Sequence, residues 1–207
     1  MGAVECPHRG EGLRVTASVE GMPASYGEAS VQEEIRVKTL LLLRHAKSSW
    51  DEAGFRDHDR PLSARGIRAA ERMGRHFAEC GHDPARVLCS SSQRTRETLA
   101  RLRSGFRREP RVDVLEDLYL ADPAELLRQI AAVPDPEPSL LVIAHNPGVG
   151  MLASQLAVDG DAQERSRMKR KYPTGALAVL SLSIEVWRHA DRGGRLLEFA
   201  VPRELGA

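Results

Sequence analysis

The sequence predicts an α/β protein, a three-layer sandwich with a mainly parallel central sheet flanked by helices. Short continuous apolar runs, such as Thr39 to Leu43 and Leu140 to Ala144, indicate buried strands. The segments between such runs carry apolar residues at spacings of three and four, which is the period of a helix. A period of two near the C-terminal end adds an antiparallel strand or hairpin. Strands that alternate with helices typically form a parallel sheet covered on both faces.

The first half of the chain predicts two strands and two helices in alternation. The strand Thr39 to Leu43 is followed by a polar loop and by Ser63, a residue type that caps helices. The helix that begins there ends at Gly81, since glycine is favoured just beyond a helix end. Val87 to Cys89 predicts a second strand, and a helix follows from about Gln93 to Arg103.

The middle of the chain repeats this alternation. Val112 to Leu115 predicts a third strand, and Asp122 opens a helix with proline next and glutamate three residues later. The proline-rich stretch 134–138 is a loop, and Leu140 to Ala144 is the fourth strand. Asn146-Pro147 then begins a helix that runs to about Val158.

The C-terminal segment has a different period. Leu180, Leu182, Ile184 and Val186 alternate with polar residues, the pattern of a strand with one wet face. The glycine-rich turn at 192–194 leads into a last apolar run, which predicts a terminal hairpin.

Composition describes an ordinary globular chain. Of 207 residues, 29% are charged and 42% hydrophobic, and the net charge is +1, so neither nucleic acid nor a membrane surface is an expected partner. No apolar run approaches the ~20 residues of a membrane span. Three cysteines without metal-like spacing fit a reducing compartment. We therefore expect a cytoplasmic protein without metal or cofactor, of open oligomeric state and compatible with a monomer.

Residues 1–36 differ from the rest. They are rich in glycine, serine, proline and glutamate, show no sustained period, and lack the basic start and apolar core of a secretory signal. We expect a disordered N-terminal extension there and a single domain over residues 37–207. A sharper hypothesis is that translation begins near Val37.

Polar residues follow three predicted strands at their carboxyl ends, where ligands bind in parallel sheets. Arg44-His45 follows the first strand, Ser90 to Arg94 the second, and His145-Asn146 the fourth. Arginine forks and helix N-termini suit phosphate oxygens. Imidazole is also a competent nucleophile toward phosphorus. Each residue alone would more often be an ordinary surface or structural side chain, so the prediction of a phosphoryl site depends on the joint pattern.

Four segments, in order, resemble motifs of the phosphoglycerate mutase-like histidine phosphatase superfamily: LLLRHAKSSWDE, RDHDRPLSARGIRAA, VLCSSSQRTRETL and LLVIAHNPGV. Ala46 stands where the family has glycine, and Asp51 where asparagine is usual. The resemblance covers about residues 38–187 and is greatest for the small phosphohistidine phosphatases of the SixA type. It implies the phosphoglycerate mutase-like fold and a hydrolase that acts on phosphorylated substrates.

The resemblance also implies roles for individual residues. His45 becomes the phosphorylated nucleophile, and Arg44, Arg94 and His145 hold the phosphoryl oxygens. Ser48 is a further candidate for a hydrogen bond to the substrate. Asn146 joins the substrate-binding set, because it lies where a helix begins after the fourth strand.

The proton donor is open at this stage. Glu116 lies just after the third strand, where an acid could protonate a leaving oxygen, and an ordinary turn acid is an equal alternative. Phosphohistidine needs that help less, because a protonated imidazole leaves readily. The leading hypothesis is a metal-independent phosphohistidine phosphatase that forms a phospho-His45 intermediate on phosphoproteins.

Two other functions remain: a phosphomonoesterase for a small metabolite, and a non-catalytic phosphate-binding module. The basic run from Arg165 to Lys171 is either a solvated loop or a surface that attracts acidic phosphoproteins.

Overall fold

The computed structural model describes residues 37–50 and 54–206, so the expectation of a disordered segment over 1–36 lies outside the described part of the chain. The strands are β1 (Val37–Arg44), β2 (Arg86–Ser90), β3 (Arg111–Leu115), β4 (Ser139–Ala144), β5 (Ala157–Gly160), β6 (Leu177–Ser183) and β7 (Gly194–Ala200). The helices are α1 (Ala64–Cys80), α2 (Gln93–Leu102), α3 (Pro123–Ala131), α4 (Gly148–Leu156) and α5 (Ala162–Arg170).

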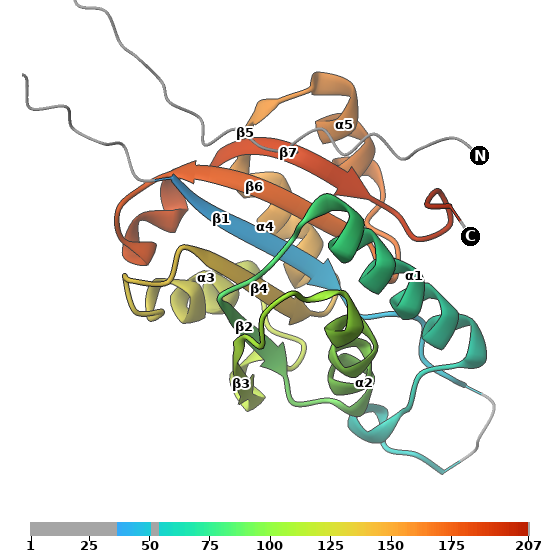
Figure 1. The fold of residues 1–207 in the computed structure, drawn as a ribbon. Coiled ribbons are helices and arrows are strands. Elements are labelled where there is room, and N and C mark those ends of the chain that lie inside the picture. The colour runs from blue at the N-terminus through green and yellow to red at the C-terminus, as the bar shows by residue number, and fades with distance from the viewer. Residues whose placement is uncertain (1–36, 51–53, 207) are drawn as a thin grey trace, which may run out of the picture.

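The described strands form one seven-stranded sheet in the order β3-β2-β4-β1-β6-β7-β5 (Figure 1). The pairs β1–β4, β2–β4, β2–β3 and β5–β7 are parallel, whereas β6 is antiparallel to both β1 and β7. The predictions of a mainly parallel sheet and of an antiparallel pair near the C-terminal end are therefore confirmed.

Two hydrophobic cores, one on each face of the sheet, make the three layers. Leu41 and Leu43 of β1 pack on the face covered by α1 and α2, with Met73 and Phe77 from α1. Leu40 and Leu42 point to the opposite face, into the core that α3, α4 and α5 cover. Because β1 is buried on both faces, its sequence is a continuous apolar run without alternation.

Two predicted helix starts have the expected caps. The Ser63 side chain accepts a hydrogen bond from the backbone N–H of Gly66, at 3.1 Å, and Asp122 accepts one from Glu125, at 2.9 Å. At the other end of α1, Gly81 adopts the left-handed conformation, with φ of 72°. These local signals made the two ends of α1 and the start of α3 predictable.

Three sequence predictions on the C-terminal side differ from the structure. The helix expected to reach Val158 ends at Leu156, and the next four residues form β5. The basic run, for which a solvated loop was one of two interpretations, belongs largely to α5, whose Asp161 cap accepts hydrogen bonds from Gln163 and Glu164. β6 also stops at Ser183, and its residues are mostly buried rather than alternating between core and solvent.

No helix in the described ranges, 37–50 and 54–206, is long and apolar enough to cross a membrane.

Candidate active site

The carboxyl ends of three neighbouring strands meet at one edge of the sheet. β4 lies between β1 and β2 and is parallel to both, and Arg44 pairs in register with Ala144. The residues that follow these strands are therefore neighbours: the rings of His45 and His145 lie 5.0 Å apart between centroids. The gathering of polar residues predicted from the strand ends is present.

His45 is held as a neutral imidazole in one tautomer. Its Nδ1 lies 2.7 Å from the carbonyl oxygen of Ala46, which can only accept, so Nδ1 carries the proton. Nε2 then carries the lone pair. Burial lowers the pKa of His45 well below its ordinary value, the Ala46 hydrogen bond opposes this, and the charges of Arg94 and Arg44 lower it further.

His145 takes the opposite tautomer. Arg94 Nη2 lies 3.4 Å from Nδ1 of His145, and because a guanidinium only donates, this nitrogen is the acceptor. Nε2–H therefore donates to the Ser90 hydroxyl, at 2.8 Å. Burial lowers the pKa of His145, and the neighbouring His45 and Arg94 act in the same direction.

Arg94 is a buried cation at the start of α2, with 4% of its surface exposed. It donates from Nη1 to the backbone carbonyl of Asp57, and from Nη2 to the Asp57 carboxylate at 2.9 Å. Tyr119 donates to the same carboxylate oxygen at 2.7 Å. The Tyr119 hydrogen bond keeps the pKa of Asp57 below its usual range, and Arg94 adds to this effect. The same Arg94 nitrogen, Nη2, thus contacts both His145 and the Asp57 carboxylate.

Arg44 and Asn146 share one anchor. Arg44 Nη1 donates to the carbonyl of Tyr172 at 2.9 Å, and Asn146 Nδ2 donates to the same oxygen at 3.0 Å. Arg44 Nε and Asn146 Oδ1 are buried and have no hydrogen-bond partner within the described residues. Burial lowers the pKa of Arg44. Both side chains therefore keep hydrogen-bonding capacity beside the histidine pair.

The other two sequence candidates lie further out. Ser48 is buried, and its backbone pairs with that of Leu62, which connects the loop after His45 to the start of α1. Glu116 is exposed, with 80% of its side chain accessible, and it accepts a hydrogen bond from the Ser91 hydroxyl at 2.7 Å. Its other described side-chain contact is with His58, at 3.8 Å.

Sequence reasoning did not single out Asp57, Ser90 as a partner of His145, or Tyr119. Asp57 and His58 lie in the RDHDRP segment, where a run of alternating charges gave the only signal. The Tyr119 ring stacks edge-on against His145 at 5.4 Å, which places an aromatic wall beside the imidazole. Such contacts join residues more than 25 positions apart and leave no local pattern.

A cleft of 560 Å³ adjoins Arg44. Its walls come from α4 and from the end of α5, with Asn146, Met151 and Tyr172 among them. Lys169, Arg170 and Lys171 are exposed on its border. Three basic residues therefore line the same cleft as Arg44 and Asn146, which are the sequence neighbours of His45 and His145.

The fold and the buried histidine pair point to a class of proteins that handle phosphoryl groups, and comparison with known families gives it a name. Residues 40–119 match the family model of the histidine phosphatase superfamily, branch 1. An uncharacterized protein of Mycobacterium leprae is 36% identical over 167 residues, which are 78% of this chain and 100% of that protein. The chain belongs to the histidine phosphatase superfamily.

Two solved structures make the similarity more specific. The candidate phosphohistidine phosphatase SixA of Nakamurella multipartitia is 32% identical, with a TM-score of 0.69 over 80% of this chain and 96% of that one. The corresponding protein of Agrobacterium tumefaciens is 27% identical, with a TM-score of 0.67 over 80% and 99% of the two chains. The fold is thus phosphoglycerate mutase-like, and the matches support a phosphatase, a hydrolase.

Proposed function

We propose that this protein is a metal-independent phosphohistidine phosphatase that acts through a covalent intermediate on His45. The observation that carries the proposal is the tautomer of His45. Its Nδ1–H donates to the Ala46 carbonyl, so the unprotonated Nε2 is the nucleophile beside His145 and Arg94. A neutral imidazole with a lowered pKa needs no base to activate it.

In the first step the Nε2 lone pair of His45 forms a bond to phosphorus, and the bond from phosphorus to the substrate nitrogen breaks. The electron pair of that bond goes to the leaving imidazole, which takes its proton from the solvent. In the second step water attacks phosphorus, the bond to Nε2 breaks, and inorganic phosphate forms with the protons of the water. His45 regains its lone pair, so the cycle closes without a redox partner.

Four side chains are suited to the charge on the phosphoryl oxygens. Arg44, Arg94, His145 and Asn146 carry N–H donors that bond to Tyr172, Asp57 and Ser90 in the described structure, and we propose that the phosphoryl oxygens take these donors when substrate enters. Preorganised donors of this kind are the main requirement of phosphoryl transfer. An incoming phosphoryl group competes with the Asp57 carboxylate for Arg94, since both are anionic ligands of one guanidinium.

The substrate proposal is phosphohistidine in a protein rather than a small phosphate ester. An alkoxide leaving group needs an acid, and the carboxyl that sequence reasoning offered, Glu116, is exposed to solvent. The basic border of the cleft at Lys169 to Lys171 favours an acidic protein surface. The two similar structures carry the name SixA phosphohistidine phosphatase.

Trapping the intermediate tests the catalytic proposal. The purified chain is mixed with a radiolabelled phosphohistidine protein in excess chelator and quenched in alkali, because the bond from phosphorus to nitrogen is acid-labile. After separation from the substrate protein, we expect the wild-type enzyme and a His189→Ala control to carry the label. The His45→Ala variant should carry none. Label in His45→Ala would refute the nucleophile. Phosphate binding without label or turnover would identify a non-catalytic module, and activity lost in chelator would refute metal independence.

The substrate proposal has its own test. Replacing Lys169, Arg170 and Lys171 by glutamine should lower kcat/KM on a phosphohistidine protein about tenfold in low salt and leave p-nitrophenyl phosphate turnover unchanged. The control variant combines Arg107→Gln and Arg108→Gln. It removes charges from an exposed pair next to Asp83, away from the cleft. An equal loss on both substrates would contradict docking through the cleft.

A further inference from the structure

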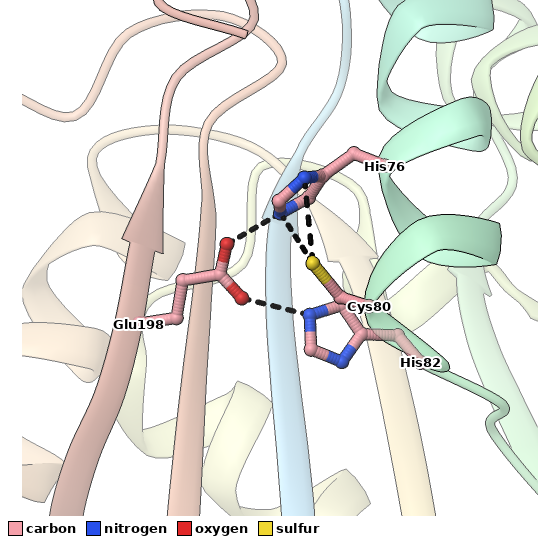
Figure 2. A group of neighbouring side chains, drawn as sticks. All are labelled: His76, Cys80, His82 and Glu198. Carbon is pink, nitrogen blue, oxygen red and sulfur yellow. Dashed lines mark hydrogen bonds and ion pairs between the residues drawn. The ribbon is translucent and has the colours of Figure 1, made fainter. Parts of the chain in front are cut away.

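Outside the candidate active site, four side chains of types that bind metal ions lie close together. His76, Cys80, His82 and Glu198 bring one ligand atom each to within 4.8 Å of one another (Figure 2). His76 and Cys80 are on α1, His82 follows its last turn, and Glu198 is on β7. Glu198 pairs with Val179, which in turn pairs with Leu41, three residues before the end of β1.

The local backbone explains why these side chains converge. His76 and Cys80 are four residues apart and share one face of α1. The left-handed Gly81 then turns the chain, so that the His82 ring lies 5.5 Å from the ring of Phe77. A bulge in β7 shifts its register against β6 between Val179 and Leu180, and Glu198 faces α1.

Glu198 holds the two imidazoles. One carboxylate oxygen accepts from Nε2 of His76, and the other accepts from Nε2 of His82 at 2.8 Å. His76 is 2% exposed, and the side chains of His82 and Glu198 are 10% and 11% exposed. A largely buried carboxyl group therefore faces two ring nitrogens.

We propose that His76, His82 and Glu198 form a binding site for a divalent transition metal ion of the zinc class, separate from the phosphatase chemistry. Two imidazoles and one carboxylate are an established set of zinc ligands, with a water completing the tetrahedron. Nitrogen and oxygen ligands at about 2 Å from zinc lie at most ~4 Å apart, so the cluster needs only a small contraction. The ion takes the place of the Nε2 proton on each ring, and each metal-bound ring carries its proton on Nδ1.

Cys80 is not counted among the ligands. Its sulfur lies 3.7 and 3.8 Å from the ring nitrogens of His76, and two imidazoles, one carboxylate and a water already complete a tetrahedral set. The ion would join α1 to β7, so its effect is on stability, since a ligand that binds only the folded state raises the melting temperature. His45 takes no part in this site.

Titration of the metal-free full chain with Zn²⁺ tests the proposal. We expect one ion per chain in calorimetry, a higher melting temperature, and zinc-dependent changes in the Nε2 signals of His76 and His82 in nitrogen-15 spectra. Glu198→Gln, which keeps the side-chain shape, should weaken binding at least tenfold. His82→Asn should do the same, and its position after the helix makes it the safer variant for folding.

Two controls separate this site from others. Cys80→Ser and His189→Ala should bind Zn²⁺ like the wild type. An ion held by the active-site histidines would survive Glu198→Gln, so unchanged binding in that variant overturns the proposal. Absence of Zn²⁺ binding in the wild type would likewise overturn it and leave a hydrogen-bonded cluster.

Discussion

Replacing Arg94 by alanine removes the most buried cation of the candidate site. Arg94 donates to Asp57 and to His145. Because only 4% of its surface is exposed, water cannot easily replace the lost guanidinium. At about 4 Å and an effective dielectric constant of 20, one charge pair is worth about 4 kcal/mol. Loss of one preorganised oxyanion donor costs about 3 kcal/mol. The two figures predict that kcat/KM falls by roughly a hundredfold to a thousandfold.

The assay is kcat/KM on a phosphohistidine protein and on p-nitrophenyl phosphate, with inorganic phosphate as a competitive inhibitor. Arg94→Ala should lower both rates and weaken phosphate inhibition, because the same guanidinium would bind substrate and product. Arg94→Lys keeps the charge but loses the fork of donors, so an intermediate rate is expected. Wild-type rates in Arg94→Ala would refute the assignment of this arginine.

Three further predictions concern the same site and its support. Asp57→Asn should strengthen phosphate inhibition up to fivefold, for about 1 kcal/mol, because an exposed carboxylate no longer competes for Arg94; weaker inhibition would contradict this. The active-site histidines have folded pKa values below their unfolded value of 6.5, so the unfolded state binds more protons and the free energy of unfolding should fall as pH drops from about 6.5 toward 4. Denaturant titrations in that range measure it, and saturating tungstate should reduce the loss. Gly66→Ala should cost about 1–3 kcal/mol in urea unfolding, since the added Cβ would lie 2.0 Å from the Lys47 carbonyl; an unchanged midpoint would refute the close packing.

The elements that could be predicted have their causes nearby in the sequence. The strands β1 and β4 are buried on both faces and read as unbroken apolar runs, and the caps at Ser63 and Asp122 are one-residue signals. His45 and His145 follow such strands directly, so their meeting at one edge of the sheet follows from parallel pairing. The local sequence was therefore enough to predict both the layers of the fold and the meeting of His45 and His145.

The elements that could not be predicted depend on distant partners. β5 is a four-residue strand that exists because β7 offers it a parallel edge, and α5 has only one buried residue, Met168. Neither has an apolar period of its own. The Asp57 contact with Arg94 joins residues 37 positions apart, and only the tertiary structure brings them together.

The backbone at the end of β1 is secured from two sides. The N–H of His45 donates to Ala144 of β4, and the N–H of Gly175, just before β6, donates to the carbonyls of both Arg44 and His45. The imidazole is thus attached to the middle of the sheet, whereas Asp57, Glu116 and the basic residues of α5 come from short 3-10 turns and an outer helix. Descendants of this chain could exchange those outer segments to accept new substrates while the reacting nitrogen keeps its position.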